Sequence, residues 1–166
     1  MTVEPDADPR VSRQAKSVKA IKRSTAAAAD VSPLDFETFR RLDPLEQGRL
    51  IRDGIDARTV ERVARELLGV PVQTLLVSLR LPSSTILRKT ANGDRLSGSE
   101  SDRLARVIFT FELAMELFDD AALAAEWMQR ENALLGGLRP LEVLDTQPGY
   151  DRVRDMLIRI TFGIAI

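Results

Sequence analysis

The sequence predicts an all-α protein, and three observations support this prediction. Hydrophobic residues make up 44% of the 166 residues and charged residues 30%, a balance typical of a globular protein. Aromatic residues make up only 5%, while Ala, Leu and Arg are abundant, which favours helices over sheets. Apolar residues recur at three- and four-residue spacing in segments that Pro and Gly separate. This length allows one well-packed domain with appendages, or two small domains.

The residues that are missing exclude several functions. The chain has no His and no Cys, so a Ser-His-Asp triad, a Cys nucleophile, a zinc finger and a disulfide framework are all excluded. It has no Walker-type or Rossmann-type glycine motif, and its carboxylates lack the spacing of a metal site. We therefore expect no enzyme activity, no cofactor and no metal. Without an 18-residue apolar segment or a signal peptide, a cytoplasmic protein that does not contact the membrane is expected.

Residues 1–31 are predicted to form a flexible arm. Val11, Ala15 and Val18 lie at helical spacing with basic residues between them. The arm is either a passive tail or a segment that binds DNA or a partner. Helical structure is then expected over residues 32–118, where Ser32 and Pro33 are predicted to begin the first short helix and Pro44 the second.

A helix-turn-helix is predicted at about residues 71–92. An apolar stripe over 57–68 ends at Gly69, and Pro71 opens the next helix. Pro82 ends that helix, and Ser83 is the expected N-cap of a helix at about 84–91, which stops at Asn92-Gly93. A short helix, a tight turn and a second short helix form the pattern of this DNA-binding motif.

The start of the second helix of this motif is rich in groups that can contact DNA. Hydroxyls bind base edges or phosphates, and Arg and Lys bind guanine or neutralise phosphates. The alternative is an ordinary capped and solvated turn. Residues 51–110 have ten basic against seven acidic residues, whereas 111–166 have five against ten, so the two halves differ in charge. The candidate DNA-binding residues are Ser83, Ser84, Thr85, Arg88 and Lys89.

The rest of the chain reads as helices joined by an ordered loop. Ser97 and Glu100 have the spacing of a capping box, which opens a long helix that reaches Phe118. Asp119 or Asp120 caps the following helix, and a short helix is expected near 140–144. A last helix over roughly 148–161 places Tyr150, Val153, Leu157 and Ile160 in register, and it ends near Gly163. The apolar end, 164–166, either packs in the protein's own core or inserts into a partner.

The segment from residue 127 to the end of the chain resembles the toxin-binding domain of Xre/MbcA/ParS-type antitoxins. The shared pattern is a Trp, an Asn, Leu-Gly-Gly, Pro-Leu-Glu-x-Leu-Asp-Thr and Arg-Ile-x-x-Gly. Here these are Trp127, Asn132, 135–137, 140–146 and 159–163. Glu131 departs from the pattern, in which a Pro often precedes the Asn. The resemblance covers about 57–166 and leaves 1–50 outside.

The resemblance implies a toxin-binding domain at 119–166 and a type II antitoxin that blocks a RES-domain toxin acting on NAD. It also implies a homodimer that binds operator DNA and represses its own operon. The alternative from the residues alone is a stand-alone helix-turn-helix transcriptional regulator whose C-terminal domain dimerises or senses a ligand. The resemblance and the apolar terminus together give the candidate toxin-binding residues, which are Trp127, Asn132, Arg139, Glu142, Asp145, Arg159, Phe162, Gly163, Ile164 and Ile166.

Overall fold

The computed structural model of the chain describes residues 33–163, and within this range the prediction of an all-α fold is confirmed. Helices follow one another throughout, and no strand forms within this range, although an isolated antiparallel bridge joins Asp56 to Arg95. The expectations for the arm at 1–31, for Ser32 and for the tail at 164–166 concern residues outside the described range. Among residues 33–163, no helix is both long and apolar enough to cross a membrane.

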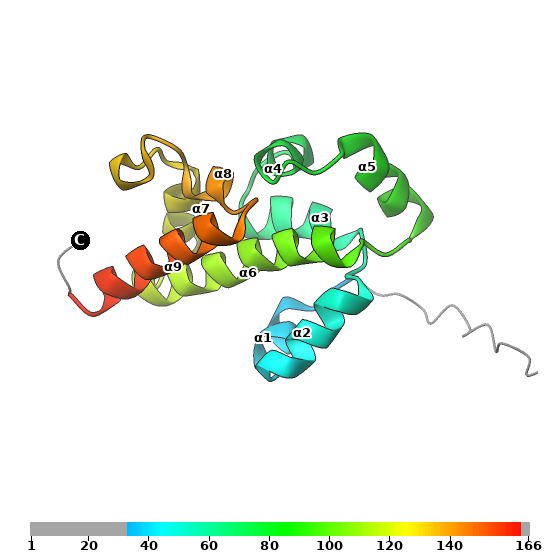
Figure 1. Cartoon of the computed structure of the whole chain (residues 1–166), viewed down its shortest axis with the longest axis horizontal. Helices are drawn as coiled ribbons and strands as arrows, with labels where there is room; N and C mark the ends of the chain where they lie inside the picture. Colours follow the sequence, from blue (N-terminus) through cyan, green and yellow to red (C-terminus); the bar gives the residue numbers. More distant parts are fainter. Residues whose placement is uncertain (1–32, 164–166) are drawn as a thin grey trace, which may run out of the picture. The chain divides into compact units, whose positions relative to one another are not determined.

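The long helix α6, Gly98–Phe118, lies at the centre of the described fold. Its predicted capping box is confirmed, because the Ser97 hydroxyl accepts from the Glu100 amide and the Glu100 carboxylate accepts from the Ser97 amide. Helices α1 (Phe36–Arg41) and α2 (Pro44–Asp53) lie on one side of α6. Helices α4 (Val72–Ser78) and α5 (Ser83–Asn92) lie on the other (Figure 1). Helix α9 (Gln147–Thr161) runs beside α6. Helix α6 therefore connects the first half of the fold to the second.

The first two helices show one confirmed start and one wrong one. Helix α2, Pro44–Asp53, begins with Pro44 in its first turn as predicted, and Asp43 caps it. Helix α1, Phe36–Arg41, begins later than the predicted start at Ser32 and Pro33. The reason is Asp35, whose carboxylate accepts from the Thr38 amide at 3.0 Å and so caps the helix three residues further along.

The apolar stripe at 57–68 forms two joined helical segments. Helix α3, Thr59–Arg62, continues directly into a π-helical turn, η1, over Val63–Leu67. The stripe buries Val60, Val63 and Ala64 completely. Gly69 follows with φ +64°, a backbone conformation that glycine adopts at low cost, and it ends the segment as predicted.

The predicted helix pair is present as α4, Val72–Ser78, and α5, Ser83–Asn92. Gly93, with φ +70°, ends α5 as predicted. The predicted N-cap is wrong, because Pro82 occupies that position and Ser83 is the first helical residue. The Ser83 hydroxyl instead accepts a hydrogen bond from Gln73 Nε2 at 3.1 Å, which ties the start of α5 to the start of α4.

The C-terminal part consists of α7, a short 3-10 turn and two further helices. Of the two candidate caps for α7, Ala121–Gln129, Asp120 is the correct one, since its carboxylate accepts from the Leu123 amide at 2.9 Å. The 3-10 turn η2 covers Ala133–Leu135, and α8, Pro140–Val143, matches the short helix predicted near 140–144. Helix α9 spans Gln147–Thr161. Its apolar stripe ends before Ile160, which is 38% exposed.

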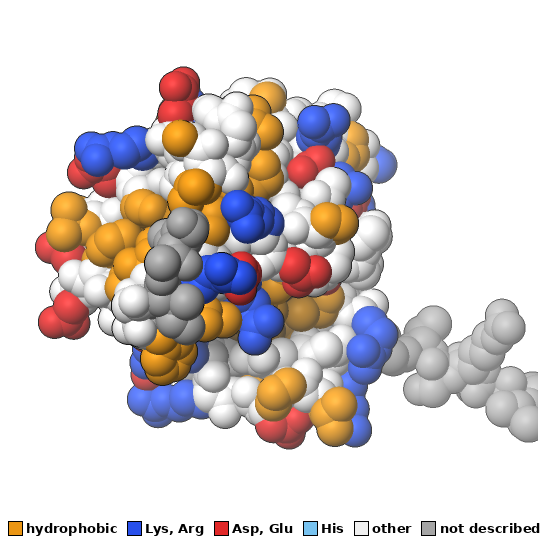
Figure 2. All heavy atoms as spheres, turned by 60° about the vertical axis from the view of Figure 1, so that its left-hand side comes forward, with side chains coloured by type: hydrophobic (Ala, Val, Ile, Leu, Met, Phe, Trp, Pro, Cys, Tyr) orange, Lys and Arg blue, Asp and Glu red, His pale blue; other side chains and the backbone are white. Residues whose placement is uncertain are grey.

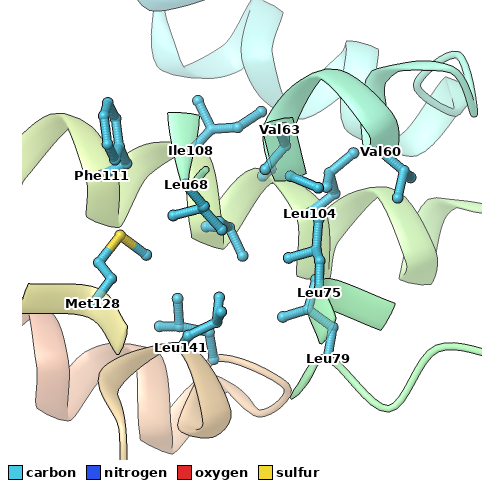
Figure 3. Packing of buried hydrophobic residues seen from close by; sticks show 14 of the residues in the cluster. Val60, Val63, Leu68, Leu75, Leu79, Leu104, Ile108, Phe111, Met128 and Leu141 are labelled. Atoms are coloured by element: carbon cyan, nitrogen blue, oxygen red, sulfur yellow. The ribbon is translucent and has the colours of Figure 1, made fainter. Parts of the chain in front are cut away.

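One hydrophobic core joins the helix-turn-helix to the C-terminal part. Side chains from α3, η1, α4, α6, α7 and α8 converge in it (Figure 3). Leu75 and Leu79 come from the α4 side, Leu104 and Ile108 from α6, and Leu141 from α8. All five side chains are at most 2% exposed. Helix α8 therefore packs against the same core as α4, the first helix of the predicted helix-turn-helix.

Candidate functional site

The outer face of α5 is the first candidate surface. Ser84 and Arg88 are exposed, Ser83 and Thr85 are partly covered, and Ile86 is fully buried. The buried Ile86 therefore orients α5, and the two predicted residues Ser84 and Arg88 lie on its solvent side. Leu87 lies beside them, 45% exposed, although the sequence reasoning did not include it.

Lys89 lies on a different side of α5 from Arg88. Its ammonium is 2.6 Å from Glu100 Oε2 on the first turn of α6, and the Lys89 side chain is only 20% exposed. Burial raises the pKa of Glu100, but the hydrogen bonds from Lys89 and Ser97 outweigh it and leave this pKa below its ordinary value. The Glu100 carboxylate is therefore charged at neutral pH, and it holds Lys89 against α6.

The turn between α4 and α5 is held by two arginines that sequence reasoning missed. Arg80 has φ +50° in the left-handed region. Its Nε lies 3.0 Å from Asp145 Oδ2, in the segment that joins α8 to α9. From α6, Arg103 Nη1 donates to the carbonyls of Leu79 and Arg80 at 3.2 and 3.1 Å. Arginines are frequent in this chain, so nothing in the local sequence distinguishes these two.

The loop after α7 is closed by Asn132 and two glycines. Asn132 Oδ1 accepts a hydrogen bond from the backbone amide of Leu134 at 2.9 Å, and the backbone amide of Asn132 donates one to the Leu138 carbonyl at 3.1 Å. Gly136 and Gly137 have φ +69° and +83°, which allows the chain to turn back within so few residues. The loop is thus ordered, and its sharp turn leaves Leu134 and Leu138 43% and 49% exposed.

The predicted residues around α8 take part mainly in local structure. Glu142 Oε2 accepts from the Arg139 amide at 2.9 Å and closes the first turn of α8, while the Arg139 side chain is exposed. Asp145 is 13% exposed and is paired with Arg80. In this conformation, therefore, the Arg139 side chain is available to a partner, whereas Asp145 faces the helix-turn-helix.

The end of α9 presents an aromatic side chain to solvent. Phe162 is 73% exposed, and it lines a hollow of about 140 Å³ between α6 and α9, together with Leu113 and Leu157. Arg159 Nε is 2.8 Å from Asp155 Oδ2, one turn earlier. Gly163 follows with φ +62°. Ile164 and Ile166, also predicted to bind the toxin, lie outside the described residues.

Trp127 lies at a second hollow, on α7. Its ring packs half-buried against Phe118, with the ring centroids 6.1 Å apart. The two rings, with Leu123, Glu126 and Arg130, line a hollow of about 280 Å³. Figure 2 brings forward the side of the molecule on the left of Figure 1 and shows hydrophobic side chains gathered on it, with Lys and Arg side chains beside them.

We define the apolar C-terminal face as the exposed hydrophobic side chains of α7, of the loop after it and of the end of α9. The face consists of Leu123, Leu134, Leu138, Ile160 and Phe162. Of these five residues, only Phe162 was predicted from the sequence to bind the toxin, because leucines at helical spacing usually belong to a core.

The carboxylates among the described residues include one with a raised pKa. Within 33–163, no group of three or more Asp or Glu side chains is placed to hold a metal ion. Burial raises the pKa of Glu112 to about 7, and it lies in a hollow of about 340 Å³ between α1 and α6. Its neighbours there are apolar side chains, the carboxylates of Glu37, Glu116 and Asp119, and Arg40.

Two family models match this chain, one on each candidate surface. Residues 46–108, which include α4 and α5, match the antitoxin Xre-like helix-turn-helix domain. Residues 113–163, which include the apolar C-terminal face, match the antitoxin Xre/MbcA/ParS C-terminal toxin-binding domain. The chain belongs to the Xre-type antitoxins. Helix α6 is divided between the two matches, in agreement with its central place in the fold.

Named relatives agree with this assignment. The "Prs ADP-ribosylating antitoxin" of Sphingobium sp. is 27% identical over 140 residues, which is 79% of this chain and 87% of that protein. "Antitoxin Xre" of Pseudomonas putida is 28% identical over 132 residues, 80% of this chain and 76% of that protein. An antitoxin Xre of Photorhabdus laumondii is 35% identical over 78 residues, 46% of this chain and 53% of that protein. This Xre-type antitoxin therefore combines a DNA-binding motif with a domain that binds a toxin.

Proposed function

We propose that this antitoxin neutralises a RES-domain toxin that consumes NAD, and that it represses its own operon as a homodimer bound to operator DNA. The observation that supports the toxin part most directly is the apolar C-terminal face, which lies within the segment matched to the toxin-binding domain. A relative named for ADP-ribosylation adds support, since that reaction takes ADP-ribose from NAD.

Inhibition of such a toxin requires binding and no chemistry by the antitoxin. Figure 2 shows hydrophobic side chains gathered on one side of the molecule, which is typical of a partner surface. Phe162 follows the last turn of α9 and is 73% exposed. In our proposal, Phe162 and the end of α9 enter the nucleotide cleft of the toxin and exclude NAD. Arg159 then leaves its ion pair with Asp155 and pairs with a carboxylate of the toxin.

The charge of the second half of the chain fits this proposal. Residues 111–166 have ten acidic against five basic residues. A cleft that binds the phosphates of NAD is basic, so the acidic half favours encounter with it and raises the association rate more than the affinity. Trp127, Asn132, Arg139, Glu142 and Asp145 stay predicted contacts or supports of this surface.

The test is cellular NAD after induction of the toxin gene, with and without this protein. We expect NAD to fall with the toxin alone and to recover with the full-length antitoxin. The key variant lacks residues 160–166, of which Ile160, Thr161 and Phe162 are exposed, so α9 should still fold. It should lose protection, whereas Leu45→Ala, which changes an apolar side chain 73% exposed on α2, should keep it.

Two outcomes would contradict the toxin proposal. Full protection by the variant without 160–166 would show that the end of α9 does not block the toxin. If NAD were unchanged by the toxin, or fell equally with the antitoxin present, the claim about NAD would fail. The protein would then fit a helix-turn-helix regulator whose C-terminal part dimerises or senses a ligand.

The DNA part of the proposal relies on the outer face of α5. In a homodimer, two such helices lie about 34 Å apart and enter successive major grooves on one face of the duplex. Arg88→Ala should weaken operator binding and lower its salt dependence, because Arg88 is exposed on this face and contacts a phosphate or a guanine. Toxin inhibition should not change, and simultaneous loss of both activities would indicate misfolding instead.

A further inference from the structure

Leu87 lies on the exposed side of α5, among residues that can contact DNA. Its predecessor Ile86 is fully buried and anchors α5, whereas Leu87 is 45% exposed. It shares the exposed face with Ser84, Arg88 and Ala91, which follow the helical spacing i, i+3, i+4 and i+7. The outer face of α5 therefore has an apolar centre beside a hydroxyl and a guanidinium.

The Leu87 side chain neither packs in the hydrophobic core nor can bind the phosphate backbone of DNA. It is absent from the described hydrophobic core and from the partly buried residues packed against that core. A leucine side chain has no donor for a phosphate oxygen, so it adds nothing to sequence-independent DNA binding. On a face that enters the groove of DNA, Leu87 is therefore suited to contact an apolar group of the base edges.

The largest apolar group in the major groove is the C5 methyl of thymine, since cytosine has only a hydrogen atom at C5. The other groups that distinguish the base pairs there are hydrogen-bond donors and acceptors. A leucine pressed against such a polar edge removes water from it without replacing the lost hydrogen bond, which disfavours binding. A leucine against a thymine methyl buries two apolar groups and is favoured.

We propose that Leu87 is a specificity-determining residue that selects thymine in each half-site through contact with the C5 methyl. The inference depends on the proposed binding of operator DNA by α5. Arg88, the next residue, anchors the helix through a phosphate or guanine, and Ala91, one turn later, extends the apolar contact along the groove. The sequence read by this antitoxin therefore contains a thymine under the centre of the exposed face.

A second copy of the chain is a less suitable occupant of this face. A stable dimer interface buries about 800 Å² on each partner. Leu87 is a single leucine between Ser84 and Arg88, and burying the guanidinium of Arg88 against another copy would leave its charge without water or a partner. DNA satisfies the polar and the apolar groups of the face together.

The experiment uses the full chain and duplexes from its own promoter, with each thymine replaced in turn by uracil. Uracil pairs identically and lacks only the C5 methyl, so the protein needs no change. We expect about a fourfold loss of affinity at one or two positions of each half-site, the ratio that burial of one methylene-sized group gives. Fluorescence anisotropy at fixed salt measures this affinity.

The matching protein variant is Leu87→Ala, and the two changes form a double-mutant cycle. The variant should bind the thymine duplex more weakly and should show no further loss with uracil at the sensitive position. Leu45→Ala is the control, because it removes an identical side chain that is even more exposed, at 73%, from α2, across α6 from α5 (Figure 1). That variant should keep the uracil sensitivity of the wild type.

The outcomes separate this inference from the proposed function. If the wild-type chain binds its promoter but tolerates every uracil, or if Leu87→Ala retains the sensitivity, the role of Leu87 is refuted while DNA binding stands. If the wild-type chain binds no promoter duplex, the proposed DNA binding fails, and the role of Leu87 fails with it. Tolerance of every uracil by the wild-type protein refutes the role of Leu87 even if Leu87→Ala misfolds.

Discussion

Glu112→Gln should remove most of the pH dependence of stability between pH 5 and pH 8. Glu112 lies half-buried on α6, between α1 and apolar side chains of its own helix. Burial is the main cause that raises its pKa to about 7, and the nearby carboxylates of Glu116 and Glu37 add to it, against the opposing charge of Arg40. The chain has no His, so few other groups titrate in this interval.

The sign follows from proton binding. In the unfolded chain Glu112 has its ordinary pKa of 4.5, whereas in the folded protein it has a pKa of about 7. Between these values the folded state holds a proton that the unfolded state has released, so its contribution to stability is complete below pH 4.5 and is lost as the pH rises through 7. The shift corresponds to roughly 3 kcal/mol, and solvent around this half-buried group reduces the expected effect to about 1–2 kcal/mol.

The assay is urea unfolding of wild type and Glu112→Gln at pH 5, 6, 7 and 8. The neutral amide avoids the cost of a buried charge, so the variant should exceed the wild type by about 1–2 kcal/mol at pH 8, with the difference shrinking toward pH 5. Glu131→Gln, at an exposed carboxylate that does not line this hollow, is the matched control and should leave the slope nearly unchanged. Parallel curves for wild type and Glu112→Gln would refute the reasoning.

Three further predictions concern stability. Gly149→Ala should cost about 3 kcal/mol or more in urea unfolding, because the new Cβ would lie 1.8 Å from the Val143 carbonyl oxygen; a loss under 1 kcal/mol would contradict this close approach. Arg80→Gly should be about 1 kcal/mol more stable than Arg80→Ala in the same assay, since only glycine relieves the positive φ; equal stabilities would show that the turn is unstrained. Lys89→Ala should lower the melting temperature by several degrees, because it leaves Glu100 partly buried without its cation; an unchanged melting temperature would argue against the pair.

Much of the helical structure could be predicted because its signals are local. Helix starts and ends depend on residues within about four positions of them. Examples are the capping box of Ser97 and Glu100, Pro44 in the first turn of α2 and Gly93 after α5. The helix starts of α1 and α5 were predicted wrongly because they too depend on local signals. At α1, Asp35 competed with Ser32 as a cap, and short-range signals do not rank such neighbours.

The candidate surfaces were only partly predictable. The helix-turn-helix spacing placed Ser84 and Arg88 correctly on an exposed face, since Ile86 marks the buried side of α5. The same spacing could not show that Lys89 is held by Glu100 or that Leu87 is exposed. Which polar side chain finds a partner depends on how α5 is placed against α6, and that placement is set by the whole core.

By itself, the sequence determined the helical class, most helix limits and the order of a DNA-binding motif and a toxin-binding segment, because periodicity, caps and family motifs are written in neighbouring residues. Only the tertiary structure decided that Arg80 pairs with Asp145, 65 positions away, and that Glu112 is buried enough to titrate near neutral pH. These properties depend on distances between helices and on the water excluded from between them. Such quantities exist only after the core has packed.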